Sequence, residues 1–178
     1  ATYYATHNAA GGGVGSLGDP FTLQELLDAV TSSDLGLVRA TGTYTPSAAL
    51  DVDTNTGTNT ARPTIRGCAS DGTDDGTVAT ISGSSLPSST SLLAITNGYD
   101  YLVFENLRFT ASKNYGIDSN SKGSKYINVR IDNAASHGFY QQTLGDNSVF
   151  IDCEVDHNGG AGYTGPFSSR GSGSWYRC

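Results

Sequence analysis

A short motif recurs along the second half of the chain and constrains the fold more than any other feature. Its copies are Glu105-Asn106-Leu107-Arg108-Phe109, Ile127-Asn128-Val129-Arg130-Ile131 and Ile151-Asp152-Cys153-Glu154-Val155, and a fourth begins at Tyr176-Arg177-Cys178. The copies therefore follow one another at a nearly constant spacing. A second landmark keeps step with the first, because Gly116, Gly138 and Gly162 each lie seven residues after the end of a copy.

The spacing of roughly 22–25 residues, with about two β-segments per repeat, is typical of one coil of a solenoid. Leucine-rich repeats have a similar period but need regularly spaced leucines, and a propeller blade needs about 40 residues or more. One coil cannot bury its apolar face alone, so the copies must stack, about 4.8 Å apart. The repeated glycines are expected at corners where a Cβ atom would crowd the chain.

Alternation along the repeated strands predicts which side chains point inward. Two inward columns are expected, Leu107, Val129, Cys153 and Cys178 in one, and Phe109, Ile131 and Val155 in the other. The predicted outward residues are Asn106, Asn128, Asp152, Arg108, Arg130, Glu154, Thr110, Asp132 and Asp156. Glu105 does not fit this scheme, because Ile127 and Ile151 occupy its column.

The first half of the chain begins with a helix signal. Thr22 and Glu25 have the spacing of a capping box, and Leu23, Leu26, Leu27 and Val30 then recur at helical period. We therefore expect an amphipathic helix near residues 21–31 that caps the open end of the β-stack. Short strands are predicted at residues 36–40, 63–66, 79–82 and 92–95, with a polar connection at 51–62.

These signals predict one domain over residues 1–178. Residues 1–35 hold an N-terminal strand and the capping helix, 36–100 the first irregular coils, and 101–178 the regular coils. The last coil stops in mid-strand at Cys178. We therefore expect either that the natural chain continues, or that a copy in a homo-oligomer or another structural chain covers this coil.

Composition and charge exclude several classes of partner. Gly accounts for 23 of 178 residues and charged residues for 15%, which suits short strands and turns. The net charge of -7 argues against nucleic acid, and no apolar run approaches the roughly 20 residues needed for membrane insertion. The cysteines lack metal-ligand spacing. Cys153 and Cys178, one coil apart, are either two buried thiols or a disulfide.

The first half of the chain resembles the entry segment of pectate-lyase-like right-handed parallel β-helix proteins. The residues that carry the resemblance are Tyr3-Tyr4, Asp19-Pro20-Phe21, Leu37-Val38-Arg39, Gly42-Thr43-Tyr44 and Pro63-Thr64-Ile65-Arg66-Gly67. The resemblance implies an all-β, right-handed parallel β-helix over essentially the whole chain. That superfamily includes secreted polysaccharide lyases and glycoside hydrolases, and bacteriophage tailspike and other virion proteins.

Acidic residues are predicted to gather on one outward sheet, beside Arg108 and Arg130. Asp132 and Asp156 should be neighbours on adjacent coils, where two carboxylates repel unless a proton or cation lies between them. Asp132, Glu154 and Asp156 are therefore candidate Ca²⁺ ligands, and Asp132, Asp152 and Asp156 are candidate catalytic carboxylates. The resemblance implies an Arg or Lys base, which makes Arg130 a candidate. The alternative is a solvated face with an Arg130–Glu154 pair.

Two other acidic segments are expected to be turns rather than metal sites. Asp51–Gly57 superficially resembles a calcium loop, but its Gly is one place late and its twelfth position is Arg62. Asp71–Gly76 is a cluster of turn residues.

Aromatic and amide residues near the second landmark suggest a carbohydrate site. Tyr140 and Tyr163 can stack on sugar rings, and His137 and Gln141 can hydrogen-bond to sugar hydroxyls. Corner or core packing is the alternative for each of them.

Three functions are consistent with these features. The first is a β-helical virion or cell-surface protein that engages polysaccharide, located outside the cell or on a virion. The second is a secreted polysaccharide lyase or glycoside hydrolase, and the third is a structural subunit of a filament or capsid. Calcium-dependent cleavage of a glycan favours the second, binding without turnover the first, and neither favours the third.

Overall fold

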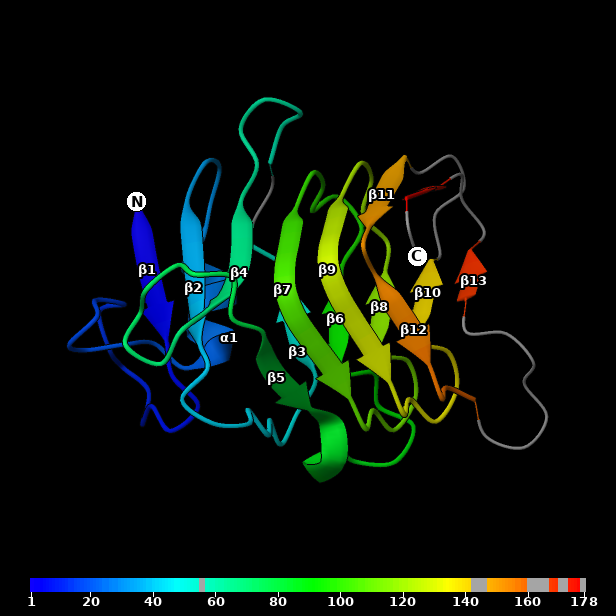
Figure 1. Cartoon of the computed structure of the whole chain (residues 1–178), viewed down its shortest axis with the longest axis horizontal. Helices are drawn as coiled ribbons and strands as arrows, with labels where there is room; N and C mark the ends of the chain where they lie inside the picture. Colours follow the sequence, from blue (N-terminus) through cyan, green and yellow to red (C-terminus); the bar gives the residue numbers. More distant parts are fainter. Residues whose placement is uncertain (55–56, 142–146, 160–166, 170–172, 177–178) are drawn as a thin grey trace.

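The protein is described by a computed structural model that covers residues 1–54, 57–141 and 147–159, and the backbone of 167–169 and 173–176. Two parallel β-sheets face each other, and the chain passes from one to the other in successive coils (Figure 1). The strands of the larger sheet are β1 (Thr2–Ala5), β2 (Leu35–Arg39), β4 (Thr64–Cys68), β5 (Ala79–Ser82), β7 (Val103–Thr110), β9 (Lys125–Asp132), β11 (Ser148–Ile151), β12 (Glu154–Asp156) and β14 (Gly173–Tyr176). Those of the smaller sheet are β3 (Leu50–Val52), β6 (Leu93–Ile95), β8 (Ile117–Ser119), β10 (Phe139–Gln141) and β13 (Phe167–Ser169).

The strand register shows that the repeated motif is the coil. In the larger sheet the order is β1-β2-β4-β7-β9-β11-β14, with β5 beside β7 and β12 beside β9. Leu107 is paired with Val129, and Ile131 with Val155, so each residue lies beside the same motif position of the next copy. Every described pairing of strands is parallel. The solenoid of about four turns confirms the fold class predicted from the sequence.

The helix α1 (Leu23–Ala29) covers the N-terminal end of the stack. The capping box is present, since the Glu25 amide donates to Thr22 Oγ1 at 3.3 Å and the Thr22 amide donates to Glu25 Oε2 at 2.8 Å. Leu23, Leu26 and Leu27 are buried, so the apolar stripe packs onto the core as predicted. The described residues include no helix with the length and apolar character to cross a membrane.

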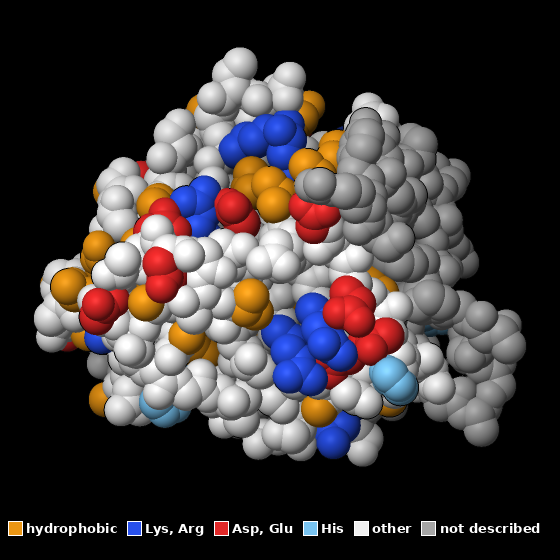
Figure 2. Space-filling model, viewed as in Figure 1, with side chains coloured by type: hydrophobic (Ala, Val, Ile, Leu, Met, Phe, Trp, Pro, Cys, Tyr) orange, Lys and Arg blue, Asp and Glu red, His pale blue; other side chains and the backbone are white. Residues whose placement is uncertain are grey.

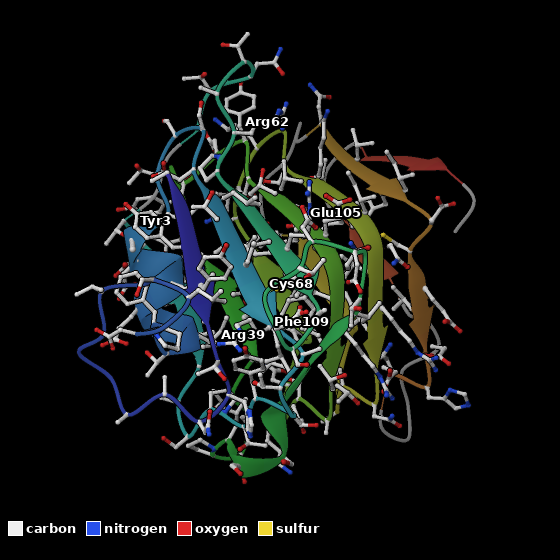
Figure 3. All side chains as sticks on the ribbon, turned by 60° about the vertical axis from the view of Figure 1, so that its left-hand side comes forward. Tyr3, Arg39, Arg62, Cys68, Glu105 and Phe109 are labelled. Atoms are coloured by element: carbon white, nitrogen blue, oxygen red, sulfur yellow. The ribbon has the colours of Figure 1, made fainter. Side chains whose placement is uncertain are left out.

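The predicted strands at residues 36–40, 63–66, 79–82 and 92–95 correspond to β2, β4, β5 and β6. Strand β3 was not predicted, because Asp51–Val52 was assigned to a polar connection. Its alternation is only three residues long, with Leu50 and Val52 buried and Asp51 between them. A 3-10 turn, η1 (Gly83–Ser85), follows β5. Tyr3 lies on β1, at the end of the larger sheet (Figure 3).

In each repeated strand segment, one residue with a left-handed backbone conformation shifts the alternation of inward and outward side chains. Asn106, Asn128 and Asp152 have φ angles of 54°, 49° and 53°, a conformation that Asn and Asp tolerate better than other side chains. The strand therefore does not alternate through this position, and Phe104 and Leu107 are both buried.

This phase shift accounts for Glu105. The column that Glu105 shares with Ile127 and Ile151 is half-buried on the outer side of the sheet rather than in the core. Arg66 Nε donates to Glu105 Oε2 at 2.7 Å. Asn106, predicted to point outward, is instead buried, and its Oδ1 accepts a hydrogen bond from Asn128 at 2.8 Å.

The core contains the predicted inward columns and one more. Leu107, Val129 and Cys153 are buried, as are Phe109 and Ile131, whereas Val155 is partly buried. Cys178 and Gly162 lie outside the described residues. The column that was not predicted is aromatic: the rings of Phe104 and Tyr126 stack with centroids 5.6 Å apart, and those of Tyr126 and Phe150 are 4.9 Å apart.

Candidate functional site

Arg108 on β7, Arg130 on β9, Asp132 on β9 and Asp156 on β12 form one charged cluster on the outer face of the larger sheet. Arg108 is in register with Arg130, and Asp132 with Asp156, as the repeat predicted. In Figure 2 this cluster is the patch of adjoining blue and red side chains in the lower part of the view, over β7, β9 and β12.

Asp132 is the anchor of the cluster. Its side chain is 1% exposed and accepts two hydrogen bonds from Arg108, from Nε at 2.7 Å and from Nη2 at 3.1 Å. Thr110 Oγ1 and Asn133 Nδ2 also donate to it. Burial alone would raise the pKa of Asp132, but the hydrogen bonds from Arg108, Thr110 and Asn133 outweigh it and lower the pKa to about 2. Asp132 is therefore ionised at every physiological pH.

Arg130 lies between carboxylates of two coils. Its Nε is 3.1 Å from Asp132 Oδ2, an ion-pair contact without hydrogen-bond geometry, and its Nη2 donates to Asp156 Oδ2 at 3.2 Å. Glu154 Oε2 lies 3.5 Å from Nη1. The guanidinium of Arg130 thus supplies the positive charge that the sequence required between Asp132 and Asp156.

This arrangement limits the predicted catalytic and metal roles. The guanidinium of Arg130 is held by three carboxylates and has no lone pair to accept a proton, so it does not fit a general base. Asp132 is enclosed and ionised, so it does not fit a proton donor. Within the described residues, no group of three or more His, Cys, Asp or Glu side chains is arranged to hold a metal ion. The Ca²⁺ site at Asp132, Glu154 and Asp156 therefore stays a prediction without geometric support.

A groove of about 380 Å³ opens beside the cluster, and we call it the arginine groove. It is lined by Val78, Thr80, Arg108, Asn128, Val129, Arg130, Asp152 and Glu154. The side chains of Arg108 and Arg130 are 39% and 43% exposed, so each guanidinium is held on one side and open to solvent on the other. Asp152, a predicted catalytic residue, lies in this groove and is exposed.

The lining offers donors and acceptors in balance. Two arginines supply planar sets of N–H donors, and Asp152 and Glu154 supply carboxylate acceptors. Val78 is exposed and adds an apolar wall. A ligand with many hydroxyl groups fits this lining, because each hydroxyl both donates and accepts.

Two of the four predicted carbohydrate-binding residues come together in an aromatic group. The rings of Tyr115 and Tyr140 stack with centroids 4.5 Å apart, and His137 lies 5.6 Å from the first and 6.0 Å from the second. His137 is buried, and its Nδ1 lies 3.0 Å from Ser136 Oγ. Tyr115 belongs to this group because it precedes Gly116 as His137 precedes Gly138, so the repeat places the two residues at equivalent corner positions.

The other two residues do not join this group. Gln141 is 2% exposed, and its amide donates to the Ser121 carbonyl at 3.1 Å in the interior. This placement does not fit the prediction that Gln141 contacts a sugar, because strand alternation turns it inward while Tyr140 faces outward. Tyr163 lies outside the described residues.

Sequence reasoning missed Thr110 and Asn133 as partners of Asp132, and Val78 and Thr80 as walls of the groove. Thr80 is in register with Arg108, yet β5 precedes the regular repeat. The motif therefore carries no signal for these two walls. Thr110 occupies the repeat position of Asp132 one coil earlier, and Asn133 directly follows Asp132, but only the hydrogen bonds of the folded chain show their role.

Comparisons with known proteins bear on the fold. No protein-family model matches the sequence, and a search of curated proteins found no match. Among solved structures, the crystal structure of pectate lyase Pel9A is similar, with a TM-score of 0.58 and 20% sequence identity. The alignment covers 85% of this chain and 46% of that chain, so the present chain spans about half the length of its structural neighbour. The similarity shows the pectate-lyase-like parallel β-helix fold, as the entry segment predicted.

Proposed function

We propose that this chain engages polysaccharide through the arginine groove. The observation that carries the proposal is the pair of half-exposed arginines, Arg108 and Arg130, fixed on one side by a buried, ionised Asp132. Prepositioned guanidinium groups bind with a smaller loss of side-chain entropy than free ones. The stacking of coils supports the proposal, because it places the two arginines about 4.8 Å apart along the solenoid axis, in line with an extended polymer.

The charge balance of the groove favours a glycan rich in hydroxyls over a highly charged polyanion. The two arginines are offset by Asp152 and Glu154 within the lining, and the chain carries a net charge of -7. A polyanion would meet repulsion from this surface at low ionic strength. Neutral or weakly acidic polysaccharides are therefore the expected ligands.

Binding without turnover fits the groove better than cleavage. Asp132 is enclosed and ionised and Arg130 is held by carboxylates, so neither of these two residues supplies the free acid or base that a hydrolase or lyase needs. We extend the proposal to a β-helical virion or cell-surface protein located outside the cell, with a secreted polysaccharide lyase or glycoside hydrolase as the alternative.

A polysaccharide panel tests the proposal. The chain is mixed with neutral and acidic polysaccharides, with and without Ca²⁺, while binding, new reducing ends and absorbance from unsaturated sugars are all followed. We expect binding to at least one glycan, weakened about tenfold or more by Arg108→Ala or Arg130→Ala, which corresponds to about 1.4 kcal/mol. Lys122→Ala is the matched control, because Lys122 is an exposed cation outside the groove.

Two results would count against the proposal. Unsaturated or reducing products that disappear in Asp156→Ala would make the chain an enzyme. Binding that the two arginine variants leave unchanged would show that the groove is not the contact surface.

A further inference from the structure

A larger pocket, of about 450 Å³, lies at the N-terminal end of the solenoid, and we call it the N-terminal pocket. It is enclosed by the turn after β1, the start of α1 and the segment from Tyr44 to Leu50 that leads into β3. Its volume falls within the roughly 300–1,000 Å³ of small-molecule sites. It shares no lining residue with the arginine groove.

The walls of the N-terminal pocket are held by hydrogen bonds. Thr6 Oγ1 lies 2.7 Å from Thr41 Oγ1, and His7 Nδ1 lies 2.9 Å from the same hydroxyl. On the opposite wall, the Gln24 side chain donates to the Asp51 carbonyl at 2.9 Å and accepts from the Asp51 amide at 3.0 Å. The cavity is therefore preformed in the folded chain.

The lining has a polar rim and an apolar floor. Leu23, Tyr44 and Leu50 are buried and form apolar surface, while Thr45 and Ser47 are exposed. The hydroxyls of Thr45 and Ser47 make no hydrogen bond within the described part of the chain, so both are available to a ligand.

No carboxylate, ammonium or guanidinium group of the described residues lines the pocket. Its lining residues, which all belong to the described range 6–50, include no Asp, Glu, Lys or Arg. A charged ligand would lose hydration here without an opposite charge to replace it. A sugar ring combines an apolar C–H face with a rim of hydroxyls, and it matches both parts of the lining.

We propose that the N-terminal pocket is a second carbohydrate site, which binds a neutral mono- or disaccharide unit independently of the arginine groove. The class of ligand follows from the lining of this pocket alone, which is rich in hydroxyls and, within the described range 6–50, lacks carboxylate, ammonium and guanidinium groups. A glycan held at both sites would gain avidity, because the second contact becomes intramolecular.

The test uses the 178-residue chain, cellobiose as the neutral probe and digalacturonate as a charged disaccharide. Amide chemical shifts are followed during titration with each. Cellobiose should produce saturable shifts at residues 45–49, and digalacturonate should bind there at least about tenfold more weakly, about 1.4 kcal/mol. The absence of saturable shifts, or equal binding of the two probes, would overturn the proposal.

Variants separate this site from the groove. Ala48→Trp fills the pocket from an exposed position and should abolish the shifts, whereas Ala135→Trp, at an exposed alanine outside the pocket, should not. If Ala48→Trp fails to fold, the Thr45→Val/Ser47→Ala pair replaces it and should weaken binding several-fold. Cellobiose binding that survives these changes contradicts the pocket assignment. Arg108→Ala should leave the shifts at 45–49 intact, so a failure of the groove proposal remains distinguishable from a failure here.

Discussion

At the scale of single residues, Asp132 and Asp156 occupy equivalent repeat positions but differ in burial, and this difference gives them different roles. Both lie in register on neighbouring coils, and both contact Arg130. Asp132 is covered and also receives hydrogen bonds from Arg108, Thr110 and Asn133. A carboxylate buried in this way must keep its donors, because the loss of a partner leaves an uncompensated buried group. Asp132 thus positions the arginines rather than meeting a ligand itself.

Replacement of this carboxylate should destabilise the protein in a pH-dependent way. A pKa lowered from 3.8 to about 2 corresponds to about 2 kcal/mol of unfolding free energy at neutral pH. Because the folded pKa is the lower one, this stability is present above about pH 4 and lost as the pH falls through about 2. In urea unfolding, Asp132→Asn should therefore lose about 2 kcal/mol at pH 7 and progressively less below pH 4.

The control is Asp74→Asn, which removes a partly exposed partner of Arg66. Surface ion pairs contribute roughly 0–1 kcal/mol, so this variant should stay within about 1 kcal/mol of wild type. Equal losses in the two variants at pH 7 would contradict the anchoring role of Asp132.

The corner glycines allow a second prediction at this scale. A Cβ atom at Gly116 would lie 2.3 Å from Ile131 Cγ2 and 2.6 Å from the Gly138 carbonyl oxygen. Gly116→Ala should therefore destabilise the chain by about 1–3 kcal/mol through overpacking. Gly18→Ala is the matched control, because nothing lies within 4 Å of its added Cβ, and its midpoint should move little. Equal thermal midpoints for the two variants would refute the packing explanation.

At the scale of secondary-structure elements, each repeated strand segment contains a left-handed residue and is followed by another. Ala111, Asn133 and His157 have φ angles of 54°, 55° and 48°, and each directly follows one of the paired residues Thr110, Asp132 and Asp156. A left-handed residue recurs in each coil at this position after the paired strand residue, so the conformation belongs to the geometry of the corner. Asn tolerates it, whereas a left-handed conformation destabilises an ordinary L-residue by roughly 1–2 kcal/mol.

Ala111 is therefore the strained member of this series. Ala111→Asn, which copies the residue one coil later, should raise the unfolding free energy by about 0.5–1 kcal/mol. The same change at Ala135, an exposed alanine without a positive φ angle, should give no gain. Denaturant unfolding of the two variants measures this difference in unfolding free energy. A loss of stability in Ala111→Asn would show that unfavourable contacts of the new side chain outweigh the relief of backbone strain.

The elements also show what the sequence could predict. Register and period were predictable, because stacked coils must repeat their apolar residues and corner glycines at nearly constant spacing. The phase shift at Asn106 was not predicted, because alternation assumes an extended backbone. Its available signal was the recurrence of Asn or Asp at this motif position, since these residue types tolerate a positive φ angle. For the site, the repeat placed Arg108, Arg130, Asp132 and Asp156 together correctly. It could not indicate that Asp132 is covered, since burial depends on neighbours in space.

At the scale of the whole molecule, three buried groups with shifted pKa values, Asp132, Cys68 and Tyr44, act at opposite ends of the pH scale. The hydrogen bonds of Asp132 hold its pKa at about 2. Cys68 is a fully buried free thiol in β4, and burial raises its pKa to about 11 from a usual value of 9.0. Burial also raises the pKa of Tyr44, whose hydroxyl contacts the Ala5 and Arg39 carbonyls. Acid therefore weakens the folded state by protonating Asp132, and alkali weakens it by ionising Cys68 and Tyr44.

The contribution of these three groups to stability should accordingly be level from about pH 4 to 9 and fall on either side. On the alkaline side the folded pKa of Cys68 is the higher one, so its contribution is complete below about pH 9 and is lost as the pH rises through about 11. Thermal unfolding from pH 2 to 11 measures both limbs. Cys68→Ala should flatten the alkaline limb and leave the acid limb unchanged, whereas Asp132→Asn should do the reverse. An alkaline limb that is equally steep without Cys68 would assign it to Tyr44 and to the general loss of positive charge, and would remove the thiol from the account of stability.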